Sequence, residues 1–224
     1  NCLGRYEDAI SYHQQSLEID REIGNRRGIA NSLGNLGNVY NSLGRYEDAI
    51  SYHQQSLEIY REIGDRQGVA VYLNNLGNAH NSLGRYEEAI SYHQQSLDIR
   101  REMGDRGGVA YSLNGLGIAY NSLGRYEEAI SYCQQSLEIY REIGDREGVA
   151  ASLGNLGIAY NSLRQYEEAI SYYQQSLEIY REIGDRGGEA SSLCNLGIAY
   201  NCLGRYEDAI SYHQQSLEID REIG

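Results

Sequence analysis

The stretch NSLGRYEDAISYHQQSLEI, residues 41–59, decides the fold because it returns with scattered changes from residues 81, 121, 161 and 201. The period is therefore 40 residues. A copy that lacks its first part opens the chain, which divides into a half unit and five full units: 1–24, 25–64, 65–104, 105–144, 145–184 and 185–224. Such a fixed period is typical of repeat proteins, in which each unit packs against its neighbours.

The first half of each full unit has the hydrophobic periodicity of an α-helix. In the unit 25–64, apolar side chains recur every three or four positions and so share one face, namely Leu33, Leu36, Tyr40 and Leu43. Asn25, or the aspartate that replaces it in later units, precedes this pattern as an N-cap, and Gly44 supplies a left-handed stop. We therefore expect a helix over about residues 26–43.

A second helix is expected from Tyr46 to a stop at Gly64. Glu47 and Asp48 in its first turn interact favourably with the positive end of the helix dipole. The predicted apolar stripe consists of Ala49, Ile50, His53, Leu57, Tyr60 and Ile63. One helix pair cannot bury both stripes, so neighbouring pairs must stack into an all-α solenoid without a globular centre.

The motif positions of each full unit match those of the tetratricopeptide repeat: Leu36, Gly37, Tyr40, Gly44, Tyr46, Ala49, Tyr52, Ser56 and Leu57. The chain resembles this family, with Leu33 where tryptophan is often found. Its period is longer than the common one of about 34 residues, and Arg61 stands where the usual motif has a helix-ending proline. The YREIGDRxGxA junction is similar to that of kinesin light chains, of adaptors that link G-protein subunits to spindle proteins, and of bacterial MalT-type regulators.

The resemblance implies a right-handed superhelix of antiparallel helix pairs whose first helices line a concave groove. It implies that this groove holds a partner peptide or protein and catalyses no reaction, so we expect a scaffold or adaptor and no enzyme. The competing hypothesis is a structural array that associates end to end without a dedicated ligand. Residues 1–24 and 201–224 are identical, and neither end carries a polar capping helix.

The candidate ligand-binding residues lie on the face of the first helix opposite its packing stripe, where the copies also differ. One row of amides consists of Asn35, Asn75, Asn155 and Asn195 and is broken at Gly115; a second consists of Asn41, Asn81, Asn121, Asn161 and Asn201. Asparagine both donates and accepts, so these rows can bond the main chain of an extended peptide, or they simply solvate the helix.

The same face changes character along the chain. Asn38 and Asn78 in the first two full units give way to Ile118, Ile158 and Ile198 in the last three. We therefore expect polar contacts with one part of a partner and apolar contacts with the other.

Composition narrows the classes of function. The chain has 19 basic and 32 acidic residues, a net charge of −13, which argues against binding the nucleic-acid backbone. No apolar run is long enough to span a membrane, and charges throughout the first 24 residues are unlike a signal peptide. Four cysteines without metal-ligand spacing indicate free thiols and a cytoplasmic location. The start in mid-motif without methionine suggests a piece of a longer protein.

Residues that could carry chemistry are better explained by packing. His13, His53, His93 and His213 share one repeat position with Cys133 and Tyr173, which predicts a half-buried packing role and no metal, cofactor or catalytic site. The glycines of GNLGNVYNSLGR, residues 34–45, look like a phosphate loop but fall in the helical pattern. We expect close helix approach at Gly37, a helix end at Gly44 and a variable inner-wall position at Gly34. Arg164 replaces a stop glycine, which predicts a strained or a different turn.

Overall fold

The computed structural model describes residues 2–223, with side chains from residue 5 onward. This part of the chain is helical and contains no strand. The helices are α1 (Cys2–Glu22), α2 (Arg26–Ser42), α3 (Tyr46–Glu62), α4 (Arg66–Ser82), α5 (Tyr86–Met103), α6 (Arg106–Ser122), α7 (Tyr126–Ile143), α8 (Arg146–Ser162), α9 (Tyr166–Ile183), α10 (Arg186–Cys202) and α11 (Tyr206–Ile223). We call the even-numbered ones the first helices and the odd-numbered ones the second helices.

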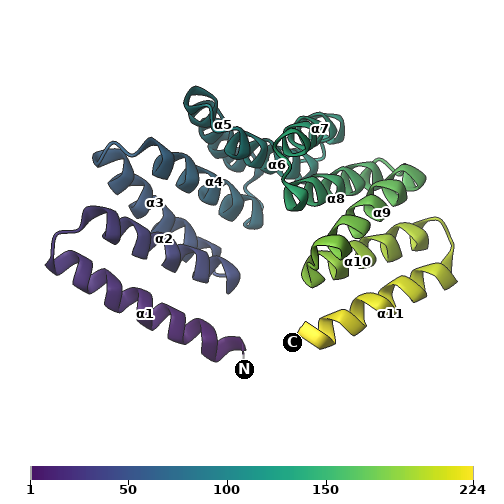
Figure 1. The fold of residues 1–224 in the computed structure, drawn as a ribbon, viewed down its shortest axis with the longest axis horizontal. Helices are drawn as coiled ribbons and strands as arrows, with labels where there is room; N and C mark the ends of the chain where they lie inside the picture. Colours follow the sequence, from purple (N-terminus) through teal and green to yellow (C-terminus); the bar gives the residue numbers. More distant parts are fainter. Residues whose placement is uncertain (1, 224) are drawn as a thin grey trace. The chain divides into compact units, whose positions relative to one another are not determined.

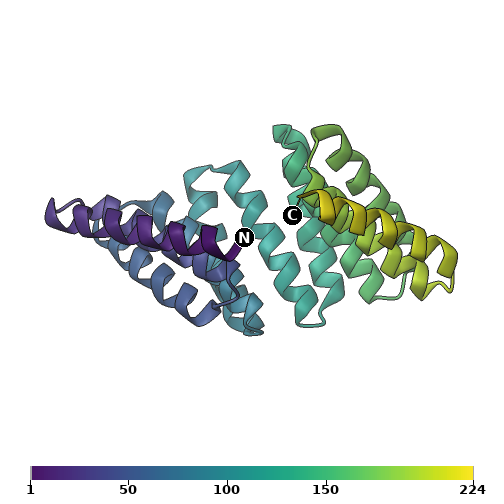
Figure 2. The same ribbon diagram turned by 90° about the horizontal axis from the view of Figure 1, so that it is seen from below.

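The helices form two compact units, Asn1–Asp105 with α1–α5 and Arg106–Gly224 with α6–α11, each described by itself. Within each unit, every helix packs against the next one along the chain and runs antiparallel to it (Figures 1 and 2). The predicted all-α array of antiparallel helix pairs is confirmed. A single solenoid over the whole chain stays a prediction.

The helix ends follow from the expected capping residues. The Asn25 side chain accepts a hydrogen bond from the Gly28 N–H at 3.1 Å, and Asp65, Asp145 and Asp185 cap α4, α8 and α10 in the same way. Gly44 has φ +72°, and its N–H donates to the Asn41 carbonyl at 3.0 Å. These bonds satisfy backbone groups that a helix end leaves without a partner.

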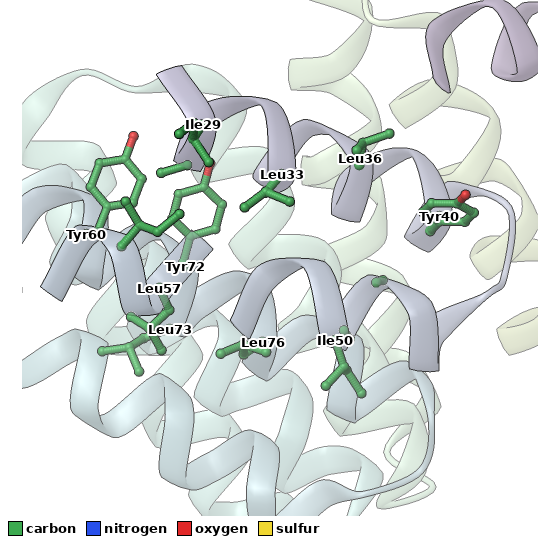
Figure 3. Close-up of a cluster of buried hydrophobic side chains, with 14 of the residues drawn as sticks. Ile29, Leu33, Leu36, Tyr40, Ile50, Leu57, Tyr60, Tyr72, Leu73 and Leu76 are labelled. Atoms are coloured by element: carbon green, nitrogen blue, oxygen red, sulfur yellow. The ribbon is translucent and has the colours of Figure 1, made fainter. Parts of the chain in front are cut away.

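The core of each repeat is built on the predicted leucines of the first helix. Leu33 and Leu36 of α2 are almost fully buried and lie in one cluster with Leu57, as Figure 3 shows. The equivalent leucines are buried at 1% or less in the later repeats: Leu73, Leu76, Leu113, Leu116, Leu153, Leu156, Leu193 and Leu196. The same positions therefore carry the core in both units.

The prediction for the end of the second-helix stripe was wrong. Ile63 is 37% exposed, whereas Ile59 is 8% exposed and belongs to the core. Helix α3 packs against both α2 and α4, so a broader part of its surface is buried than a single stripe allows. Ile63 follows the last helical residue, Glu62, and is not part of the buried cluster.

A hydrogen bond that the periodicity did not predict ties the two helices of each repeat together. The buried Ser56 Oγ donates to the Ala30 carbonyl at 2.8 Å. The same bond joins Ser96 to Ala70, Ser136 to Ala110, Ser176 to Ala150 and Ser216 to Ala190. A buried hydroxyl needs such a partner, which explains a serine inside the packed interface.

Arg164 adopts the left-handed conformation with φ 61°, as expected, and is the one non-glycine residue with positive φ in the described range. We predict that Arg164→Gly raises the free energy of unfolding by about 1 kcal/mol, because a Cβ is disfavoured in this conformation. Urea denaturation checks this result. Gly204→Arg at the equivalent turn should lower the stability by a similar amount, and equal stability of all three proteins would contradict the argument.

Candidate functional site

The first-helix face, defined by the predicted positions Asn35, Asn38, Ile118, Ile158 and Ile198 and their equivalents, carries a row of exposed isoleucines. Ile118, Ile158 and Ile198 are 38%, 37% and 43% exposed. They occupy the same repeat position on α6, α8 and α10, and α8 contacts both of the other helices. The unit Arg106–Gly224 thus presents apolar side chains to solvent at regular intervals.

The amide row of this face is partly bonded to itself. Asn35 is exposed, whereas Asn75, Asn155 and Asn195 are half-buried. The Asn155 Nδ2 donates to the Asn114 Oδ1 at 2.9 Å, so an amide of α8 is bonded to one of α6. Asn38 is exposed and Asn78 half-buried. The polar groups most open to a ligand are therefore those of α2.

The second amide row points its carbonyl oxygens into the protein. Among the described residues, the Oδ1 atoms of Asn41, Asn81, Asn121 and Asn161 are buried and have no hydrogen-bond partner, whereas Asn201 is exposed. A buried oxygen is not available to an extended peptide on the surface. The remaining part of each side chain is what this row can offer to a ligand.

Gly34 was expected at a variable position on the inner wall; the position does vary between repeats, but Gly34 is not open to a ligand. Gly34 is buried, and a Cβ on it would lie 1.9 Å from the Tyr72 hydroxyl oxygen. The equivalent Asn74 is buried, with its Oδ1 2.8 Å from the His93 Nδ1. A first helix also contacts the first helix of the neighbouring repeat, so its buried arc is wider than the leucine stripe suggested.

A cleft of about 500 Å³, which the helix pattern did not predict, lies in the unit Asn1–Asp105. It is lined by Arg27, Asn31, Tyr60, Asp65, Gln67, Gly68, Val71 and Tyr72. The Tyr60 hydroxyl donates to the Asn31 Oδ1, and the Tyr60 ring stacks on Tyr72 with centroids 5.3 Å apart. The sequence contains one signal of this cleft, Tyr72, since the other repeats have serine at this position.

In the repeats between residues 25 and 184, the recurring histidine position is more deeply buried than predicted, whereas His13 is half-buried and His213 is exposed. His53, His93 and Cys133 are 1% exposed, and Tyr173 is 3% exposed. Burial lowers the pKa of His53 and of His93 to about 4 and raises the pKa of Cys133 to about 12. The chain places these side chains opposite Gly37 and its equivalents, where the two helices of a repeat approach closely.

The described residues hold no group of three or more His, Cys, Asp or Glu side chains arranged to bind a metal ion. None of the helices between residues 2 and 223 combines the length and the apolar character needed to cross a lipid bilayer.

The comparisons with solved structures show the same fold. BtubC (BKLC) from P. vanneervenii is 21% identical with a TM-score of 0.78, over 97% of this chain and 92% of that one. A putative kinesin light chain with nearly identical repeats from Podosopora anserina is 21% identical with a TM-score of 0.65, over 86% of this chain and 95% of that one. NprR in complex with its cognate peptide NprX is 18% identical with a TM-score of 0.75, over 95% of this chain and 63% of that one.

No curated protein sequence matches the chain. The model of the tetratricopeptide repeat family matches residues 1–62, 28–102, 108–182 and 149–222. These matches cover most of the chain and follow the helix pairs of both units. The chain therefore belongs to the tetratricopeptide repeat family.

Proposed function

We propose that the chain is a protein-interaction scaffold whose first-helix face binds a peptide or a segment of a partner protein. The observation that carries this proposal is the row of exposed Ile118, Ile158 and Ile198. Regularly spaced apolar side chains that face solvent are better explained by contact with an extended or helical partner than by a role in the folded core. The neighbour NprR, which has the same fold, was solved with a peptide bound.

In this proposal the two units contribute different chemistry. The exposed amides Asn35 and Asn38 of α2 offer donors and acceptors to a partner's main chain, whereas the isoleucines of α6, α8 and α10 contact its apolar side chains. The scaffold would hold its partner without chemical conversion, need no cofactor and act in the cytoplasm. A concave shape of the binding face is part of the same proposal.

The test compares two triple variants of the full chain in capture experiments. Ile118→Asp, Ile158→Asp and Ile198→Asp together should weaken binding of the captured partner at least about tenfold, because charges replace the apolar contacts. The matched control is Ile143→Asp, Ile183→Asp and Ile223→Asp, which changes exposed isoleucines of the second helices. Circular dichroism checks that both variants are folded.

Two outcomes would overturn the proposal. One is a partner that binds the first-helix variant as tightly as the wild type. The other is equal weakening by both variants, because binding would then depend on net charge and not on the first-helix face.

Self-association through the terminal helices is the second candidate function. Ile210 of α11 is 57% exposed, although the equivalent Ile50 and Ile170 are each 8% exposed. The identity of residues 1–24 and 201–224 suggests that a second copy of the chain covers this apolar face. Light scattering over a range of concentrations separates the two candidates, since a concentration-independent monomer would leave only the scaffold.

A further inference from the structure

Helices α1 and α11 come from identical segments of sequence but are buried through opposite faces. Leu17 of α1 is 6% exposed, whereas the equivalent Leu217 of α11 is 49% exposed. Two positions further along the order is reversed, since Ile19 is 58% exposed and Ile219 is 4% exposed. The apolar face that α11 presents to solvent is therefore the face that α1 buries.

Helix α1 buries this face against α2 (Figure 1), which is the one helix that it contacts within the described residues. Leu17 lies in a buried cluster with Leu33 of α2, and the Ser32 Oγ donates to the Ser16 Oγ at 3.1 Å. The equivalent serine pair of α7 and α8 has the same spacing of 3.1 Å. The interface between α1 and α2 is thus equivalent to the one that joins a second helix to the next repeat further along the chain.

The residue near the end of each second helix is matched to the N-cap of the following first helix. Where α1 meets α2, the Asn25 Nδ2 donates to the Asp20 Oδ1 at 2.8 Å. Two repeats later, the Arg100 Nη1 lies 2.8 Å from the Asp105 Oδ2. The other pairs combine a tyrosine with an aspartate cap: Tyr60 and Asp65, Tyr140 and Asp145, Tyr180 and Asp185. Among the described residues, no such pair therefore places two carboxylates together.

The end of α11 fits the N-cap of α2 better than that of any other first helix. Asp220 of α11 is the equivalent of Asp20 and is exposed. Asn25 is the one residue at this cap position that is not an aspartate. An aspartate cap opposite Asp220 would add like-charge repulsion, whereas Asn25 would donate a hydrogen bond.

We propose that α11 of a second copy of the chain displaces α1 from α2 and so joins the two copies head to tail. The inference rests on the second candidate under the proposed function, self-association, and names the surface that carries it. The occupant is specified by sequence, because α11 brings to α2 the same apolar face and the same aspartate that α1 already places there.

Such an exchange has a low cost because it replaces one interface by an identical one. The incoming α11 would be buried on both faces, against α10 of its own chain and against α2 of the other copy. The same holds within the chain for α3, where Leu57 is 2% and Ile59 is 8% exposed. Helix α1 is held by α2 alone, so its release breaks no further helix contact.

The test measures the molar mass of the full chain by light scattering over a range of concentrations, with one substitution in each of the two identical segments. Leu217→Asp should weaken association at least about tenfold, because a charge replaces the apolar contact with α2. Leu17→Asp is the same change at the equivalent position, but it should strengthen association at least about tenfold, because a loosened α1 leaves α2 free for α11. Circular dichroism checks that both variants are folded.

A second set of variants tests the match at the N-cap. Asn25→Asp repels Asp20 and Asp220 alike and should change association little. In this background, Asp220→Asn should strengthen association several-fold, because α11 then carries the better partner for an aspartate cap. Asp20→Asn in the same background should weaken association by a similar factor, because α1 then holds α2 more tightly.

Limited trypsin digestion reports the release of α1. A displaced α1 has lost its one packing partner, and a helix in a protein owes most of its stability to such packing. At a fixed trypsin concentration, cleavage after Arg21 should therefore become faster as the concentration of the wild-type chain rises. In Leu217→Asp the rate should not depend on the concentration of the chain.

The inference is overturned if Leu17→Asp fails to strengthen association, if Leu217→Asp leaves it unchanged, or if cleavage after Arg21 is independent of concentration in the wild type. A wild-type monomer at every concentration would overturn the second candidate function as well. Association of the wild type together with any of the first three outcomes would overturn only the exchange on α2.

Discussion

Gly157→Ala should lower the free energy of unfolding by up to about 2 kcal/mol, although alanine is the better helix former. A Cβ at this position would lie 2.5 Å from the Tyr173 ring, which is itself buried. Overpacking of this kind costs about 1–3 kcal/mol, which outweighs a gain of about 1 kcal/mol in helix propensity. Urea denaturation measures the loss.

Gly154→Ala in the same helix is the matched control. Its Cβ would meet only the Ser176 Oγ, at 3.6 Å, which is an ordinary contact distance. We expect this variant to be more stable than the wild type by about 0.5–1 kcal/mol, because only the propensity gain remains. Equal effects of the two substitutions would refute the claim that close helix approach, and not helix propensity, requires Gly157.

The stability of the protein should fall as the pH is lowered from about 6.5 to about 4. Burial lowers the pKa of His53 and His93 from 6.5 to about 4, so the folded state binds protons less readily than the unfolded state. Their contribution to stability is complete above pH 6.5 and is lost as the pH falls toward 4. About 1.4 kcal/mol per pKa unit gives up to about 3 kcal/mol for each histidine.

Urea denaturation across this pH range checks the prediction. His53→Cys introduces the residue found at the equivalent Cys133. This variant should lose less unfolding free energy between pH 6.5 and 4, by the contribution of one histidine. His213→Cys changes an exposed side chain at the same repeat position and should leave the dependence as it is in the wild type. If the two variants retain the same pH dependence, the buried histidine is not its source.

The candidate site shows how much a single helix pattern can predict. The pattern places Ile118, Ile158 and Ile198 opposite the leucine stripe, and all three are exposed. It fails at Gly34, which is buried against Tyr72 of the neighbouring repeat. The pattern assigns each residue a position around its helix relative to one packing partner. A first helix in this array contacts the two second helices beside it and also neighbouring first helices.

A cleft of this kind could not be predicted from the sequence for a related reason. The cleft at Tyr60 and Tyr72 combines residues of different repeats. Each wall belongs to a different helix. Spacing along one helix reports nothing about the distance between two helices, so only packed coordinates show which side chains share a cavity.

The sequence by itself determined the period, the two helices of each repeat, their caps and the leucines of the core, because these depend on local conformational preference and on the burial of one apolar face. Tertiary structure alone decided that Ile59 is buried instead of Ile63 and that Ser56 bonds the Ala30 carbonyl. These features depend on contacts between helices, and such contacts exist only once neighbouring repeats have packed.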